Sequence, residues 1–162
     1  MAYITMEEYG KWYGTADISN FDRLAFEASR LLDRLTTGVD GVKKLKSHFP
    51  TDPEDAEAVR FCAARIVNFL YGVAAAEAAA VQGRGYDQTE QGLRGKVISS
   101  VSAGNESISY ASSGAAGTAF DAAAADVSAR DQAARELARE GLQGVCDANG
   151  VNLLYMGPYP RG

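Results

Sequence analysis

The sequence predicts a mainly α-helical protein: a small helical bundle with a long central helix, one β-hairpin and an extended C-terminal tail. Apolar residues recur at steps of three and four along most of the chain, which is the period of one helix face. Short β-prone runs replace this period only between residues 96 and 111, and Pro158 and Pro160 exclude a helix near the end. The length of 162 residues is typical of a single domain, here residues 1–162.

The first two helices are predicted over residues 6–13 and 19–36. Thr5 and Glu8 have the spacing of a capping box before the first helix. The second helix has an apolar stripe opposite a charged face, made by Phe21, Leu24, Ala28, Leu31, Leu32 and Leu35. Residues 37–51 are rich in glycine and lysine, which predicts a solvated loop with room for one helical turn. The aromatic residues near the start are expected to pack on the bundle or to contact another subunit: Tyr3, Tyr9, Trp12 and Tyr13.

Two longer helices are predicted over residues 53–80 and 119–142. Asp52 is a good cap, Pro53 suits the first helical position, and the acids that follow favour the positive end of the helix dipole. The first of these helices is rich in alanine, which permits close packing against another helix. Glycines interrupt regular structure over residues 82–95, and Gly141 and Gly144 mark a frayed end of the last helix.

The hairpin is predicted over residues 96–111, around Ala103-Gly104-Asn105. Two strands alone are marginally stable in water, so they need cover from this chain or from a partner. Either arrangement is open for the apolar residues of the strands, which are Val97, Ile98, Ile108 and Tyr110. The tail, residues 150–162, must fold back or dock on another chain. We favour a subunit or partner contact for its large side chains, which are Leu153, Leu154, Tyr155, Met156 and Tyr159.

The composition argues against several kinds of chemistry. A net charge of -5 disfavours a surface that grips nucleic acid. His48 is the single histidine, so no serine or cysteine triad with a histidine base and no typical metal site is expected. Cys62 and Cys146 are expected to be reduced thiols. We therefore expect no catalytic residue, metal or cofactor. No basic and apolar leader and no membrane-length apolar run is evident, which predicts a cytoplasmic protein without a membrane contact.

The order of four sequence pieces resembles the small head-tail connector (adaptor) proteins of tailed bacteriophages. Tyr3-Ile4-Thr5-x-x-Glu8-Tyr9 opens the chain, and the helix Phe26-Glu27-Ala28-Ser29-Arg30-Leu31-Leu32-Asp33 leads to Thr36-Thr37-Gly38. The third piece is the serine-rich strand pair that ends in Ser107-Ile108-Ser109-Tyr110. The fourth is Gly150-Val151-Asn152-Leu153-Leu154-Tyr155-Met156-Gly157, so the pieces span nearly the whole chain.

This resemblance implies a homo-oligomeric ring that matches the twelvefold symmetry of the phage portal protein. The ring would close the DNA-filled head in the virion neck and dock a downstream neck or tail protein. It would assemble in the bacterial host cytoplasm, and genomic DNA would only pass through its lumen. A generic cytosolic helical protein-binding module is the alternative, and a small enzyme that uses carboxylates alone is a remoter one.

Overall fold

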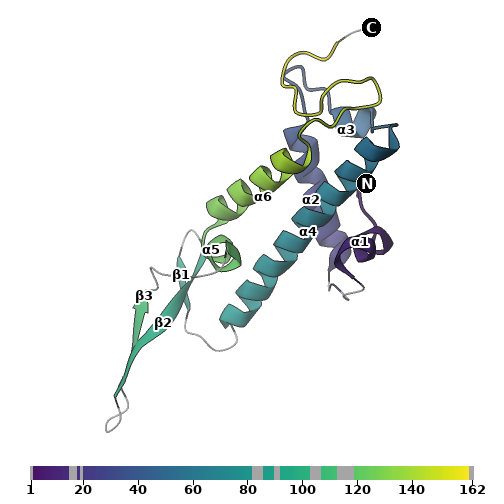
Figure 1. Cartoon of the computed structure of the whole chain (residues 1–162). Helices are drawn as coiled ribbons and strands as arrows, with labels where there is room; N and C mark the ends of the chain where they lie inside the picture. Colours follow the sequence, from purple (N-terminus) through teal and green to yellow (C-terminus); the bar gives the residue numbers. More distant parts are fainter. Residues whose placement is uncertain are drawn as a thin grey trace. The chain divides into compact units, whose positions relative to one another are not determined.

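The computed structural model describes residues 2–14, 18, 20–81, 86–89, 92–102, 107–112 and 119–160. Within these ranges the chain is mainly helical, as the sequence predicted (Figure 1). The structure divides into two compact units, whereas the length alone predicted one domain. Unit 1 comprises Met1–Asn68 and Ala134–Gly162, and unit 2 comprises Phe69–Ala133. We describe each unit by itself.

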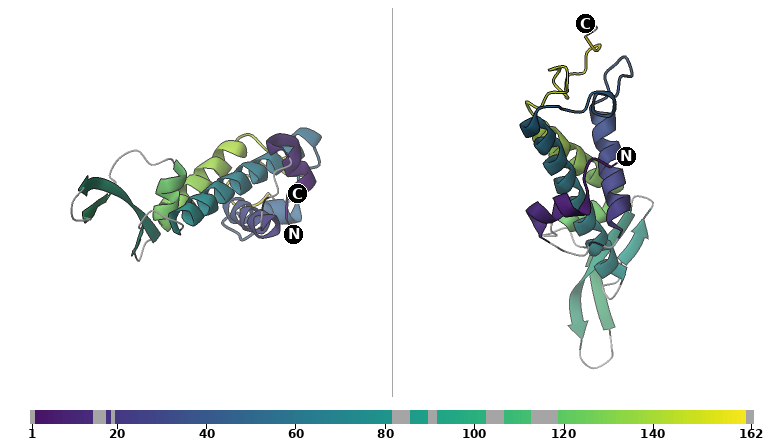
Figure 2. Two further views of the ribbon diagram at one scale, coloured as in Figure 1. Left: turned by 90° about the horizontal axis from the view of Figure 1, so that it is seen from below. Right: turned by 90° about the vertical axis from the view of Figure 1, so that its right-hand side faces the viewer.

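Unit 1 is a small helical bundle. It contains α1 (Met6–Tyr13), α2 (Phe21–Leu35), α3 (Lys44–Ser47), the beginning of α4 (Pro53–Val81) and the end of α6 (Val127–Gly141). Figure 2 shows α2 and the end of α6 beside the first turns of α4. The apolar stripe that the sequence predicted for α2 and the apolar residues at the beginning of α4 supply most of its core. Fully or almost fully buried members are Leu24, Ala28, Leu32, Val59, Cys62, Ala63, Ile66 and Val67.

Side chains fix where the helices of unit 1 begin. The capping box before α1 is present, with Thr5 Oγ1 accepting from Glu8 N at 3.2 Å and Glu8 Oε2 accepting from Thr5 N at 2.9 Å. Asp52 Oδ1 accepts from the backbone N–H groups of the first turn of α4, which confirms the predicted start. By contrast, α2 begins at Phe21 and not at residue 19, because Asn20 takes a left-handed backbone conformation with φ of 67°.

The aromatic residues near the start pack on the bundle. Tyr9 is buried, and its hydroxyl donates to Asn68 Oδ1 at 2.9 Å. Three ring pairs join the start of the chain to other elements: Tyr9 with Phe21 at 5.7 Å, Trp12 with Phe61 at 5.4 Å, and Tyr3 with Phe49 at 5.7 Å between ring centroids. The prediction of packing within the bundle is thus confirmed for Tyr3, Tyr9 and Trp12.

Helices α4 and α6 approach closely in unit 1 because the residues between them are small. A Cβ atom added at Gly141 would lie 2.7 Å from Cys62 Sγ, a distance that packed atoms do not tolerate. Ala134 and Ala138 are buried along the same contact. Helix α6 ends at Gly141, as predicted, but this glycine packs against Cys62, which corrects the prediction that the end is frayed.

Unit 2 contains the end of α4, three strands, α5 (Ala119–Ala125) and the beginning of α6. The rings of Phe69 and Phe120 lie 6.0 Å apart, and Gly72 leaves room for the Phe120 ring. The sequence predicted one helix over residues 119–142, but the structure has two. Asp126 separates them because its Oδ1 accepts from Ser128 N at 2.8 Å and so caps α6.

The strands of unit 2 are β1 (Tyr86–Thr89), β2 (Gly92–Ser102) and β3 (Ser107–Ser112), described here by their backbone. They pair in the order β1-β2-β3, and both pairs are antiparallel. Regular structure thus extends into residues 82–95, where the sequence predicted an interruption. Residues 103–106, the turn of the predicted hairpin, lie outside the described residues, so the hairpin over residues 96–111 stays a prediction.

Helix α4 is long. Its stretch Pro53–Ala78 is long and apolar enough to cross a membrane by length and composition alone, whereas no such stretch was expected from the sequence. The core helix of a soluble bundle meets the same two criteria. In unit 1 the apolar side chains of α4 face the protein core, and 44% of the most apolar window is buried.

Candidate functional site

The C-terminal segment, residues 145–160, folds back onto unit 1. Leu153 is completely buried, and its N–H donates to Val145 O at 2.9 Å. A short antiparallel bridge pairs Cys146 with Asn152. Val39 N donates to Met156 O at 3.3 Å, which holds the segment against the loop that precedes α3. The prediction of an extended tail over residues 150–162 is therefore wrong for the described residues up to 160.

The buried side chain of Lys44 in α3 holds this segment through hydrogen bonds to its backbone carbonyl groups. Its side chain is 1% exposed, and Nζ donates to Asn152 O at 3.2 Å, to Leu153 O at 2.9 Å and also to Tyr155 O. A buried ammonium group requires such acceptors, because its desolvation is costly. Burial lowers the pKa of Lys44, and the nearby carboxylates of Asp147 and Asp40 raise it in part. The lysine thus orders a segment more than one hundred residues away in the chain.

Asp147 organises the other side of the C-terminal segment. Its Oδ1 accepts from the N–H groups of Asn149 and Val151, both at 2.9 Å. Its Oδ2 accepts from the Tyr159 hydroxyl at 2.6 Å, and the Tyr159 ring stacks on His48 at 4.9 Å. Burial and the hydrogen bond to Asp147 raise the pKa of Tyr159. Tyr159 is half-buried, so its ring and hydroxyl are used mainly within this chain.

Three exposed apolar residues lie where the C-terminal segment is hydrogen-bonded to the loop before α3. Val39 is 73% exposed, Met156 is 53% exposed and Tyr155 is 48% exposed. Among the side chains that the structure describes, Phe26 of α2 and Val127 of α6 are large apolar residues of similar exposure, at 50% and 47%. We call Val39, Tyr155 and Met156 the apolar patch. Hydrophobic side chains gathered in this way are typical of a protein contact surface.

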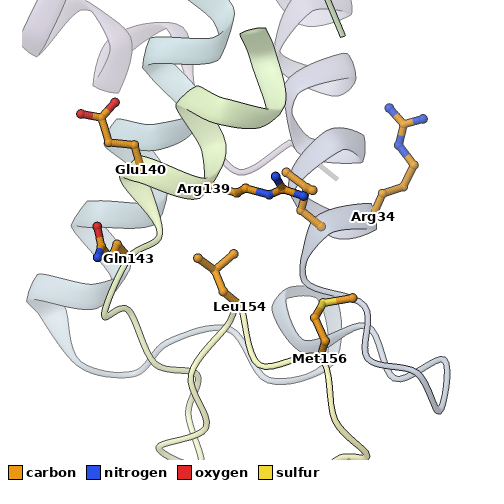
Figure 3. Close-up of a pocket in the computed structure, with 7 residues that line it drawn as sticks. Arg34, Arg139, Glu140, Gln143, Leu154 and Met156 are labelled. Carbon is orange, nitrogen blue, oxygen red and sulfur yellow. The ribbon is translucent and has the colours of Figure 1, made fainter. Parts of the chain in front are cut away.

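A hollow of about 570 Å³ lies beside the patch, between the ends of α2 and α6 and the C-terminal segment. Arg34 of α2 and Arg139 of α6 both line this hollow; Figure 3 shows the Arg139 side chain extending across the space above Leu154, whereas the guanidinium of Arg34 points outward. Leu35 and Gln143 complete most of its lining, with Glu140 at the edge. Glu140 is paired with Arg65 at 2.9 Å, whereas Arg34 and Arg139 have no ion pair or hydrogen bond with any side chain that the structure describes. The hollow is therefore apolar at its floor and cationic at its rim.

The structure separates the tail residues that the sequence grouped as a partner contact. Leu153 lies in the core, which corrects its prediction as a partner contact. Leu154 lines the hollow, and Tyr155 and Met156 belong to the exposed patch. In the strands, Ile98 is paired with Tyr110, while Val97 and Ile108 oppose Ala111 and Val101. The side chains of these strand residues lie outside the described part, so their role as a contact stays a prediction.

Sequence reasoning missed Val39, Lys44, Arg34 and Arg139. Val39 stands between two glycines in a segment that was interpreted as a solvated loop, and Lys44 stands in the basic cluster of the same segment. An exposed valine in a turn was the one local signal for the patch. The arginines occupy the last turns of α2 and α6, where positive charge is already favoured by the helix dipole. Their convergence depends on tertiary contacts.

The described residues form no arrangement of side chains that is typical of a catalytic site or a metal site. No group of three or more histidine, cysteine or acidic side chains is placed to hold a metal ion there. Both cysteines are free thiols, as predicted. Burial raises the pKa of the Cys62 thiol to about 12, so this group is a packing residue and a poor nucleophile.

Comparison with protein-family models, with curated proteins and with solved structures finds no match to this chain. The apolar patch and the hollow of unit 1 are the features of the described residues that indicate a function.

Proposed function

We propose that this chain is a virion structural protein of a tailed bacteriophage, a head-tail connector that forms a ring on the portal. The observation that carries the proposal is the apolar patch of Val39, Tyr155 and Met156, held on a fixed segment of unit 1. Exposed apolar side chains on an ordered scaffold lose little entropy when a partner binds them, which suits a docking surface. The resemblance of the four sequence pieces to connector proteins supplies the class of partner.

The chemistry of the described residues supports a structural role. The buried thiol of Cys62, the buried ammonium of Lys44 and the Asp147 carboxylate all have packing or hydrogen-bonding duties within unit 1. None of them is left facing an open cavity as a reactive group would be. An acidic connector also suits a ring through which genomic DNA passes without sticking, because like charges repel.

In this proposal the ring binds the portal protein, helps to close the DNA-filled head and offers a docking surface to a neck or tail protein. The chain assembles in the bacterial host cytoplasm and is found in the virion neck. The predicted hairpin, with Val97, Ile98, Ile108 and Tyr110, is a further contact element of the ring.

The test is cosedimentation of the chain with the portal ring encoded beside it. We expect the wild-type chain to shift the portal boundary stoichiometrically and Val39→Glu to lose the shift, because a carboxylate at a 73% exposed apolar position opposes an apolar partner. Phe26→Glu is the matched control, since Phe26 is 50% exposed on α2 and is not part of the patch. Wild-type protein that leaves the portal boundary unchanged would contradict the proposal.

A generic helical protein-binding module is the second candidate, and the same patch and hollow favour it equally. The two are separated by the partner: a connector binds the portal and a neck or tail protein, whereas a module binds a cytosolic peptide or protein. Deletion of the C-terminal segment does not separate them. Because Leu153 and the Lys44 contacts belong to the fold of unit 1, that deletion is expected to destabilise the unit itself.

A further inference from the structure

The hollow beside the apolar patch has the composition of a site for an acidic and apolar surface. Arg34 and Arg139 rim it without partners among the described side chains, while Leu35, Leu154 and Met156 supply apolar lining. Arginine binds carboxylates through paired N–H donors, and an apolar floor favours a large hydrophobic side chain. A volume of about 570 Å³ has room for such a side chain. The occupant must therefore combine carboxylates with an apolar group.

The same chain carries such a surface on α4. Glu54, Glu57 and Phe61 follow one another at steps of three and four and so share one helix face. Both glutamates are exposed, and in the described part of the chain neither carboxylate has an ion pair or hydrogen bond. Phe61 is 39% exposed and packs edge-on against Trp12. We call these three residues the acidic face of α4.

The helix dipole accounts for only part of this acidic face. Glu54 lies in the first turn of α4, where negative charge is favourable without any partner. Glu57 lies beyond the first turn, where the dipole effect has fallen off. The helix dipole therefore does not explain why an exposed, unpaired Glu57 lies on the same face as the exposed ring of Phe61.

We propose that the hollow of one copy receives the acidic face of α4 of a neighbouring copy. Glu54 and Glu57 would pair with Arg34 and Arg139, and the Phe61 ring would cover Leu154. The hollow and the acidic face are different surfaces, so the contact is heterologous when each copy gives its acidic face to one neighbour and receives the acidic face of another. Because α2, α6 and the C-terminal segment line the hollow, α4 of the same chain leaves it free for a neighbour.

A heterologous contact of this kind continues from copy to copy and closes into a ring where the rotation permits. The inference rests on the proposed ring assembly and assigns the subunit contact within it. Met156 belongs to both surfaces, but Val39 and Tyr155 belong only to the apolar patch and Arg34 and Arg139 only to the hollow. Variants of these four residues therefore test portal docking and subunit contact separately.

The test is sedimentation velocity of the full chain, without portal, from about 10 μM to about 0.5 mM, a range that covers weak subunit contacts. We expect the wild-type chain to self-associate and Arg139→Glu and Glu57→Arg each to weaken association about tenfold or more. The double variant Arg139→Glu/Glu57→Arg exchanges the two charges and should regain association. Lys46→Glu changes the net charge as Arg139→Glu does, at an exposed residue of α3 that neither lines the hollow nor belongs to the acidic face, and should behave as wild type.

Circular dichroism of each variant checks that it is folded. Wild-type protein that stays monomeric at about 0.5 mM would overturn the contact, as would Arg139→Glu associating like wild type or a double variant that stays dissociated. Cosedimentation of the same proteins with the portal distinguishes the two proposals. Portal binding without self-association removes the contact alone, whereas self-association without portal binding keeps the contact and removes the connector role.

Discussion

Replacing Lys44 with methionine tests whether the buried ammonium group fastens the C-terminal segment. Methionine keeps an apolar stem of similar length and removes the three donors of Nζ. The contact with Leu153 O is fully buried, so this carbonyl loses a charge-assisted hydrogen bond worth about 1.5–3 kcal/mol. The contacts with Asn152 O and Tyr155 O are half-buried, where water replaces much of the loss, about 0.5 kcal/mol each. Relief of the desolvated charge offsets a part, which leaves a net loss of about 2–3 kcal/mol.

The assay is guanidinium unfolding followed by the fluorescence of Trp12, the single tryptophan, which lies in unit 1. Lys46→Met is the matched control, because Lys46 is exposed on the same short helix, and it should change the free energy of unfolding by less than about 0.5 kcal/mol. Hydrogen exchange at the Leu153 amide should accelerate in Lys44→Met only. Equal stability of the two variants, within about 0.5 kcal/mol, would refute the reasoning.

Two further predictions follow from close contacts elsewhere in unit 1. Gly141→Ala should lower the free energy of unfolding by about 1–3 kcal/mol, because the new Cβ meets Cys62 Sγ at 2.7 Å, and Cys62→Ala should recover part of the loss in a double-mutant cycle; additive effects would contradict this. Burial and a hydrogen bond to Asp33 raise the pKa of Tyr3 above its ordinary 10.0, so the folded state keeps a proton that the unfolded state releases. This stabilisation is complete below pH 10 and is lost as the pH rises further. Melting temperatures from pH 9 to 11.5 should therefore fall less steeply in Tyr3→Phe than in wild type, and parallel curves would contradict the assignment.

The sequence predicted the elements whose signals are local. The capping box at Thr5 and the Asp52-Pro53 start of α4 depend on neighbouring residues, and the structure places both helices at those starts. The break at Asp126 also depends on a local contact, but residues 119–142 were interpreted as one continuous helix. Its side chain caps α6 because Ser128 N lies within reach, a geometry that exists only once α5 has ended.

The candidate site could not be predicted because it depends on contacts between residues far apart in the chain. Lys44 and Leu153 are separated by 109 positions, and nothing near either residue in sequence indicates the other. Because Lys44 lies in a basic segment, the sequence predicted that it is solvated. Because Leu153 lies in an apolar run near the C-terminus, the sequence predicted that it contacts a partner. Both predictions were wrong. The apolar character of the run correctly indicated burial, but it did not indicate whether Leu153 is buried within its own chain or against a partner chain.

Folding back and docking are compatible functions of the same short segment. The turn in which Tyr155 N donates to Asn152 O at 3.0 Å directs successive side chains to different places: Leu153 into the core and Met156 to the surface. Lys44 holds the backbone of this turn, so Tyr155 and Met156 are presented in a fixed arrangement before any partner arrives. A partner then avoids the entropic cost of ordering them, which is about 1–2 kcal/mol for each backbone residue. Lys44 thus contributes to the proposed docking without touching the partner, because a loosened segment exposes the same side chains at a higher entropic cost.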